Sequence, residues 1–435
     1  MSLHVNSLIL FFQVSLADET RYYHSTKTKK VYIRPSSRVL KGMIAPYDSF
    51  VISERLEGTS SCPVGWGRVH DNGVICMKSV QETDTPPTAQ PMMEFIPPNP
   101  EEFEYDHANP PSLSLDVPVE PFVPHIHARI MDGSRGRLWA SADAYESGEA
   151  PNWRLKENRD YRFVDVIDTK KGMVLERPNG RVTPVEEWFV YPVSQFMGRD
   201  IVEEPPALGH SIAWAVEKSN APIYASPSQE QEPVGYASFQ ESFDVVVVDE
   251  EWLQIDSFFG EDQDGYIQSQ YTRRWIPAEK PEYVQDDIWI DIHLSQQTLA
   301  VYQGDDLLYV TLISSAKDGF TTPTGIYNIY SKSSSWDLGS KKNAAEYYYM
   351  ENVPWVMHYY PRYAIHSAFW HADFGMPASH GCINMSVRDI AHVFSYMEPM
   401  LPKGWWVIRE DREERGSIVR IRKNSLKLQD KRRKR

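Results

Sequence analysis

Cys382 and His366 are the residues of this chain whose types and spacing suit nucleophilic chemistry. Cys382 ends the segment Ser379-His380-Gly381-Cys382, and His366 lies upstream of it. A cysteine attacks as the thiolate, and a free thiol with a pKa of about 8.5 is only a few per cent ionised at neutral pH. A neighbouring imidazole can take or hold the thiol proton. The pair therefore predicts a cysteine nucleophile with a histidine base.

The residues beside Cys382 suit an acyl-transfer site. Gly381 leaves no side chain next to the sulfur, so a substrate carbonyl can approach. The N–H groups of Gly381 and Cys382 are predicted to be free to bind the oxyanion that forms when the carbonyl is attacked. Ser379 and Asn384 can hydrogen-bond the loop and thereby fix the direction of the sulfur.

Short strands and one helix are expected to position these residues. Residues 386–389 have the spacing of a capping box, and apolar residues follow at helical intervals until Pro399, so a short helix is predicted after the cysteine. Runs of alternating or aromatic residues bounded by turn residues predict the strands. These are a meander over 288–312, then 326–329, 363–365 leading into His366, and 405–408 as the last strand.

Residues 285–410 resemble the catalytic domain of the L,D-transpeptidase (YkuD-type) family. Its signature is a histidine followed downstream by Ser/Thr-His-Gly-Cys, which His366 and residues 379–382 match. The resemblance implies a mainly β fold: a YkuD-type β-sandwich or α+β domain with a cysteine-bearing loop and a short helix. Further matched segments follow one another in the same order: 294–299, 322–325, 353–357, 366–371 and 374–375.

The resemblance also implies roles for single residues. Cys382 would be the acylated nucleophile and His366 its base, with the main-chain oxygen of Ser367 orienting the imidazole. The N–H groups of Gly381 and Cys382, with His380 nearby, would form the oxyanion site. Other residues are expected to bind substrate or to support the loop: Ser379, Asn384, Tyr349, Trp370 and Phe374.

The implied reaction is a pair of acyl transfers on peptidoglycan stem peptides, without a metal or organic cofactor. The thiol attacks the carbonyl on the L-centre of diaminopimelate in a tetrapeptide stem and expels D-alanine. An amine of a second stem then takes the acyl group and forms a 3→3 cross-link. Water as acceptor would make the protein an L,D-carboxypeptidase, and a protein lysine would make it a protein-to-wall ligase. Many members carry Arg where this chain has Asn384, which leaves recognition of the substrate carboxylate open.

Other interpretations of Cys382 stay open beside the enzyme. Several histidines crowd this part of the chain (His358, His366, His371 and His380), but no His-Glu-x-x-His or Cys-x-x-Cys spacing is present, so no metal is predicted. Cys382 could instead be a buried structural thiol, or the chain a non-catalytic wall-binding scaffold. The intact pair of histidine and cysteine favours the enzyme.

The rest of the chain divides by composition. An apolar run and a small-x-small site in residues 1–17 resemble a signal peptide, and the run is too short to span a membrane. The protein is therefore expected to be exported, periplasmic or cell-wall associated. Residues 32–35 together with 66–69 resemble a bacterial SH3-like domain, a family that usually accompanies cell-wall enzymes. Such domains are expected to bind wall or partner proteins or to act as spacers. The expected segments are an SH3-like domain at 18–82, a Pro-rich linker at 83–124, a β-rich domain of unknown role at 125–205, a second SH3-like domain at 206–280, the catalytic domain at 281–410 and a basic tail at 411–435.

Charge and cysteine usage narrow the partners and the compartment. The net charge is −15, although residues 415–435 hold ten Lys and Arg and one acid. A body this acidic makes nucleic-acid binding unexpected, and the tail is interpreted as a solvated terminus. Cys62 and Cys76 could form a disulfide in an oxidising compartment or stay as unpaired buried thiols. If they pair, Cys382 is the one thiol left over.

Overall fold

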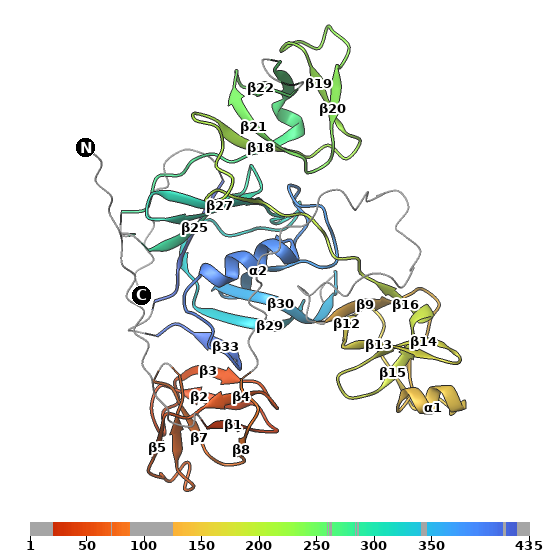
Figure 1. Cartoon of the computed structure of the whole chain (residues 1–435), viewed down its shortest axis with the longest axis vertical. Coiled ribbons are helices and arrows are strands. Elements are labelled where there is room, and N and C mark those ends of the chain that lie inside the picture. Colours follow the sequence, from red (N-terminus) through yellow and green to blue (C-terminus); the bar gives the residue numbers. More distant parts are fainter. Residues whose placement is uncertain are drawn as a thin grey trace, which may run out of the picture. The chain divides into compact units, whose positions relative to one another are not determined.

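The chain forms two compact units, Met1–Thr88 and Ala89–Arg435. The computed structural model describes residues 21–70, 72–87, 125–258, 260, 263–282, 284, 287–340, 346–411 and 415–423. The predicted signal peptide 1–17 and residues 88–124 of the predicted linker lie outside these ranges. The described residues are mainly β, which confirms the predicted fold class (Figure 1). Within them, no helix is long and apolar enough to cross a membrane.

The first unit is an antiparallel β structure around a small apolar core. Two sheets run in the orders β4-β1-β8 and β3-β2-β7-β6-β5. Val31 and Trp66 are buried, and Cys62 forms a disulfide with Cys76 in the same apolar cluster as Trp66. The SH3-like assignment of this unit stays a prediction. Its strands are β1 (Tyr22–His24), β2 (Lys29–Tyr32), β3 (Leu40–Ile44), β4 (Ser49–Val51), β5 (Glu54–Leu56), β6 (Trp66–Arg68), β7 (Val74–Cys76) and β8 (Gln81–Thr83).

Residues 126–200 form the first part of the second unit. β9 pairs antiparallel with β12 and β16, and β13, β14 and β15 form a separate sheet. Phe163 and Trp188 fill the core beside them. The elements are β9 (Ile126–Ile130), β10 (Arg137–Leu138), α1 (Ala142–Ser147), β11 (Trp153–Arg154), β12 (Asp160–Phe163), β13 (Asp165–Thr169), β14 (Gly172–Glu176), β15 (Val182–Pro184), η1 (Val185–Glu187), β16 (Trp188–Val190) and β17 (Arg199–Asp200).

The next part, called the 206–280 module, is a sheet in the order β20-β19-β23-β22-β21-β18-β24. Alternating apolar residues such as Ile223, Leu253 and Ile267 face one another in its core. Its SH3-like assignment also stays a prediction. The elements are β18 (Ser211–Ala215), β19 (Ala221–Tyr224), β20 (Gly235–Ala237), β21 (Ser242–Val247), β22 (Trp252–Ile255), β23 (Gly265–Gln268), η2 (Ser269–Tyr271) and β24 (Thr272–Arg274).

The last part carries Cys382 and consists of two sheets that share a core with a helix. One sheet runs β17-β27-β26-β25-β34-β28, and the other places β29 and β30 together with β31 and β32 beyond them. Apolar residues of both sheets and of α2 form a single buried cluster. The elements are β25 (Ile288–His293), β26 (Thr298–Gln303), β27 (Asp306–Leu312), β28 (Gly325–Asn328), β29 (Ser331–Gly339), β30 (Tyr349–Tyr360), β31 (Tyr363–Ser367), β32 (Ile383–Met385), α2 (Val387–Tyr396), β33 (Trp405–Arg409) and β34 (Ile418–Arg422).

Helix α2 begins as the capping-box spacing predicts. The Ser386 side chain accepts the N–H of Asp389 at 3.0 Å. The buried Asp389 carboxylate accepts hydrogen bonds from Thr311 at 2.7 Å and from the N–H of Gly198 at 2.8 Å. The helix that follows the cysteine is therefore tied to a strand of the facing sheet.

The prediction of a basic tail over 411–435 was wrong for its first part. β34 lies inside the six-stranded sheet, parallel to β25 and antiparallel to β28. Arg420 and Arg422 are buried there and both pair with Asp291, at 2.7 and 2.9 Å. Val419 and Ile421 alternate with them and are fully buried. Strand β33 is therefore not the last one, and the domain that carries Cys382 extends beyond residue 410.

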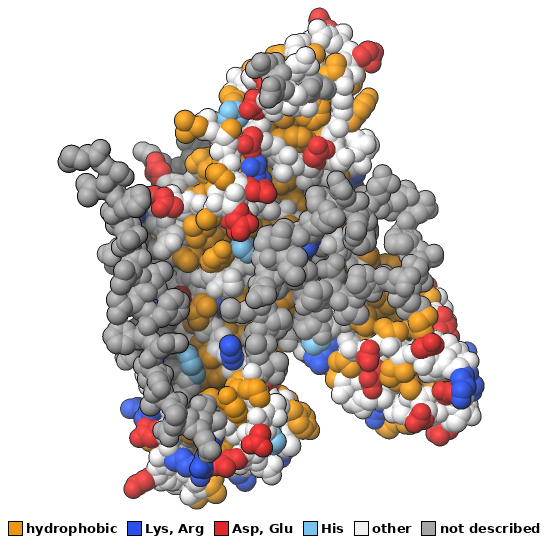
Figure 2. Space-filling view, viewed as in Figure 1, with side chains coloured by type: hydrophobic (Ala, Val, Ile, Leu, Met, Phe, Trp, Pro, Cys, Tyr) orange, Lys and Arg blue, Asp and Glu red, His pale blue; other side chains and the backbone are white. Residues whose placement is uncertain are grey.

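On the face shown in Figure 2, Asp and Glu side chains are scattered among apolar and basic ones. The whole chain carries a net charge of −15.

Candidate active site

His366 lies on the central strand of three adjacent strands, the last of which directly follows Cys382. It belongs to β31, where it faces Val356 of the antiparallel β30 and Asn384 of the parallel β32. Cys382 directly precedes β32, two positions before Asn384. The parallel register thus brings the cysteine to the end of the strand that adjoins β31.

His366 is held as a neutral base. Its Nδ1 lies 2.8 Å from the carbonyl oxygen of Ser367. A carbonyl oxygen only accepts, so Nδ1 carries the proton and Nε2 keeps its lone pair. The ring is 3% exposed, and this burial lowers the pKa of His366 to about 4, against the opposing effect of the hydrogen bond to Ser367. The Ser367 hydroxyl in turn donates to the carbonyl of Pro354 at 2.8 Å.

Cys382 is a partly exposed free thiol that holds its proton at neutral pH. Burial of the sulfur raises the pKa of Cys382, and a hydrogen bond from the backbone of Ala364 opposes this in part. Sγ lies 3.9 Å from the carbonyl oxygen of Arg362 and has no hydrogen bond to His366. The thiol and imidazole are therefore both neutral before substrate binds.

A tight loop shapes the backbone around the sulfur. The Ser379 hydroxyl accepts the N–H of Gly381 at 2.9 Å and donates to the carbonyl of Cys382 at 2.6 Å. Gly381 has φ 131°, and a Cβ there would lie 2.6 Å from the Tyr363 ring, so only glycine fits. Contrary to the prediction, the Gly381 N–H is already bonded to Ser379. The Cys382 N–H is left as the backbone donor of this loop for an oxyanion.

His380 and Tyr348 form an aromatic wall next to the cysteine. Their rings stack with centroids 5.1 Å apart, and the edge of Phe320 meets His380 at 4.4 Å. His380 Nε2 lies 2.7 Å from the Glu346 carboxylate. Burial raises the pKa of Tyr348.

Tyr349 does not lie on this side of the strand. Its hydroxyl donates to Asp337 at 2.7 Å, and the Arg159 guanidinium covers its ring at 4.5 Å. The role of Tyr349 as a substrate-side residue stays a prediction, and its neighbour Tyr348 is the tyrosine that stacks on His380. Asn352 and Trp355 both have φ 46°, so side chains do not alternate regularly between the two faces along this part of β30.

The remaining predicted residues support the loop rather than face open space. Asn384 is bonded to His371, with 3.0 Å between Nδ2 and Nε2. Trp370 lies beside His366, with ring centroids 5.8 Å apart. Phe374 is fully buried and packs on the ring of His371.

The segment 371–376 is held by the 206–280 module. Gln240 Nε2 donates to the carbonyls of Ala372 and Phe374, at 2.8 and 3.1 Å. Arg273 Nε donates to the carbonyl of Gly375 at 2.9 Å. Lys218 pairs with Asp373 at 2.7 Å. Sequence reasoning missed these residues, because nothing local to them signals a contact with a distant loop.

The 126–200 part contacts two segments next to the strand of His366, through Phe369 and Glu351. His127 stacks on Phe369 with ring centroids 3.8 Å apart, and its Nε2 lies 3.0 Å from the carbonyl of Glu351. Arg177 pairs with the Glu351 carboxylate at 2.6 Å. Glu351 belongs to β30, the strand beside β31, so this part is tied to the sheet that carries His366.

The crowded histidines do not converge on one point. His358 packs against Trp336, and burial lowers the pKa of His358 to about 4. In the described ranges, no three His, Cys, Asp or Glu side chains are grouped so that they could hold a metal ion.

Comparison with known proteins places this geometry in a family. Residues 287–421 match the family model YkuD, the L,D-transpeptidase catalytic domain. This part of the chain is therefore similar to the YkuD family. The match extends into β34, in agreement with the place of that strand in the sheet.

Relatives of the YkuD domain include proteins from several bacteria. A Bacillus subtilis protein, YciB, whose name assigns it provisionally to the L,D-transpeptidases, is 27% identical over 131 residues, 27% of this chain and 64% of that protein. The catalytic domain of Enterococcus faecium L,D-transpeptidase is 22% identical, with a TM-score of 0.25 and coverage of 32% of this chain and 98% of that one. L,D-transpeptidase 3 from Mycobacterium tuberculosis with a faropenem-derived adduct is 17% identical, with a TM-score of 0.25 and coverage of 37% and 73%.

Proposed function

We propose that the chain is a cysteine-dependent L,D-transpeptidase that acts on peptidoglycan stem peptides. The hydrogen bond between His366 Nδ1 and the Ser367 carbonyl carries the proposal, because it leaves Nε2 as a neutral proton acceptor. The match of residues 287–421 to the YkuD family supplies the substrate class. The disulfide between Cys62 and Cys76 supports an oxidising compartment, and hence export to the periplasm or cell wall.

The first half-reaction forms a thioester. His366 Nε2 takes the Cys382 proton as the sulfur attacks the carbonyl on the L-centre of diaminopimelate in a tetrapeptide stem. The oxyanion of the tetrahedral intermediate accepts the Cys382 N–H. The intermediate collapses by breaking the C–N bond, and the imidazolium returns its proton to the amine of the departing D-alanine.

The second half-reaction regenerates the thiol. An amine of a second stem attacks the thioester carbonyl and gives its proton to His366. The C–S bond breaks, the sulfur takes that proton back, and a 3→3 cross-link remains. With water in place of the amine the same steps give L,D-carboxypeptidase activity, and with a protein lysine they give ligation to the wall.

Turnover of a disaccharide tetrapeptide tests the proposal. The full chain is expected to release D-alanine, Cys382→Ala is expected to release none, and a chelator is expected to leave the rate unchanged. Release that survives in Cys382→Ala would exclude the thiol as nucleophile. Release that chelation abolishes would mean that a metal carries the reaction.

A further inference from the structure

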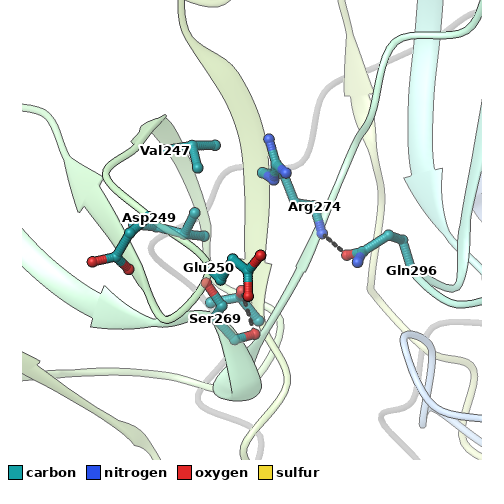
Figure 3. Close-up of a pocket in the computed structure, with 8 residues that line it drawn as sticks. Val247, Asp249, Glu250, Ser269, Arg274 and Gln296 are labelled. Atoms are coloured by element: carbon teal, nitrogen blue, oxygen red, sulfur yellow. Dashed lines mark hydrogen bonds between the residues drawn. The ribbon is translucent and has the colours of Figure 1, made fainter. Parts of the chain in front are cut away.

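A pocket lies between the 206–280 module and the turn that joins β25 to β26. Its volume is about 450 Å³, within the range of roughly 300–1,000 Å³ that is usual for small-ligand sites. Figure 3 shows Arg274 and Gln296 on one side and Glu250 and Ser269 on the other, with Val247 nearby. None of the residues assigned to the thiol chemistry lines this pocket.

The guanidinium of Arg274 is a cation at the pocket, and no described residue forms an ion pair with it. The backbone N–H of Arg274 donates to Gln296 Oε1 at 2.8 Å, but its guanidinium makes no hydrogen bond or ion pair with the described chain. The guanidinium of the adjacent Arg273, in contrast, donates to the carbonyl of Gly375. Burial lowers the pKa of Arg274, and no carboxylate opposes that effect. A partly desolvated cation without a counter-charge favours an anionic ligand group beside it.

The acidic side chains on the opposite wall of the pocket restrict the kinds of ligand that could bind there. The Glu250 carboxylate has no partner in the described chain and borders the pocket. Asp249 also borders it, although its Oδ1 already accepts two backbone N–H groups at 2.8 Å. Glu250 would repel a simple anion, and Arg274 would repel a simple cation. A ligand with both a carboxylate and an ammonium group satisfies both walls.

We propose that this pocket is a second binding site for the end of a short peptide that carries a free carboxylate and a free ammonium group. The carboxylate binds Arg274 and the ammonium group binds Glu250, while the Ser269 hydroxyl and the Gln296 amide offer further hydrogen bonds. The choice of peptide rests on the proposed function, because stem peptides with diaminopimelate carry both groups. A second site would keep a stem attached to the protein between reactions.

Calorimetric titration of the full chain tests this site, with Cys382→Ala in the background so that nothing is turned over. The probes are a tetrapeptide stem, the same peptide amidated at its carboxyl end, and the same peptide acetylated on its amine. Two binding events are expected for the unmodified stem. Arg274→Ala is expected to weaken one of them about tenfold or more, the loss usual for one charge-assisted hydrogen bond. The matched control Arg135→Ala removes an exposed arginine far from the pocket in sequence and should leave both events unchanged.

The two modified peptides test the contact with Arg274 and the contact with Glu250 separately. Amidation of the peptide should weaken the second binding event in the Cys382→Ala parent but cause no further loss of affinity in Arg274→Ala. Acetylation of the peptide should likewise weaken that event in the parent but cause no further loss of affinity in Glu250→Gln. Equal affinities in the Arg274→Ala and Arg135→Ala variants would overturn the inference. If Arg274→Ala unfolds, Glu250→Gln at the rim decides instead. D-alanine release by the chain with Cys382 intact is measured separately: turnover without a second event overturns only this inference, and a second event without turnover overturns only the proposed function.

Discussion

At the scale of single residues, the proton on the imidazole decides how the thiol is activated. His366 donates from Nδ1 to a main-chain oxygen, and its burial disfavours the charged ring. Burial also raises the pKa of Cys382. A preformed thiolate–imidazolium pair is therefore disfavoured, and proton transfer has to accompany attack on the substrate.

The low pKa of His366 predicts an unusual acid limit for activity. A histidine with the ordinary pKa of about 6.5 would be roughly 90% protonated at pH 5.5, and a base of that kind would have lost most of its activity there. With a pKa of about 4, His366 stays neutral, so kcat/KM should change little between pH 7 and 5.5 and fall only as the pH approaches 4. Initial rates of D-alanine release, with circular dichroism as a check that the chain stays folded, measure this limit.

An acid limb centred near pH 6.5 would contradict the buried neutral state of His366. Alkylation of the free thiol provides an independent readout. Its rate should rise with pH beyond neutrality, because the pKa of Cys382 is raised. A rate that is already constant at pH 6 would indicate a preformed thiolate.

Tyr348 and its neighbour Tyr349 provide a matched pair. Tyr348 lies against His380 near the sulfur, whereas Tyr349 is bonded to Asp337 on the other face of the strand. If the Tyr348 hydroxyl hydrogen-bonds the substrate in the proposed reaction, Tyr348→Phe is expected to lower tetrapeptide turnover by about tenfold, the loss of one hydrogen bond. Tyr349→Phe is expected to leave turnover unchanged. Kinetics of the two variants measure this, and the opposite order would favour the prediction made from the sequence.

At the scale of elements, the thiol loop depends on a segment far along the chain. The 206–280 module holds residues 371–376 through Gln240, Arg273 and Lys218. His371 in that segment is bonded to Asn384, which follows Cys382 in β32. The contacts of the module therefore help to hold the residues around Cys382 in place.

Gln240→Ala is expected to loosen this segment without unfolding the protein. Two carbonyls lose their donor, so amide hydrogen exchange in 371–376 should accelerate. Turnover should fall by roughly 2- to 30-fold, which corresponds to a coupling of about 0.5–2 kcal/mol. Gln263→Ala, an exposed glutamine of the same module, is the control. Faster exchange with unchanged turnover would show that the contact has no part in positioning the site.

The elements close to Cys382 were predictable because their signals are local. The capping serine of α2 and the strand over 363–365 that leads into His366 follow from short patterns, and the structure confirms both, with β31 continuing to Ser367. β34 was missed because its two arginines have the pattern of a solvated tail. Only the distant Asp291, which no local pattern indicates, explains their burial.

At the scale of the whole molecule, the fold class could be predicted from the sequence, but the contacts between distant segments could not. Runs of alternating or aromatic residues predicted many strands, and the resemblance implied a mainly β fold, which the structure confirms. The contact of His127 with Phe369 joins segments 242 residues apart, and that of Arg177 with Glu351 joins segments 174 residues apart. Long-range contacts of this kind leave no periodic signal, so the support that the site draws from 126–200 could not be predicted.

Acylation of Cys382 can be tested by the intact mass of the protein after incubation with a disaccharide tetrapeptide. The full chain is expected to gain the mass of the stem without its D-alanine, and neither Cys382→Ala nor His366→Ala is expected to gain it. An adduct on Cys382→Ala, or D-alanine release by the full chain with no adduct under rapid acid quench, would contradict acylation of Cys382.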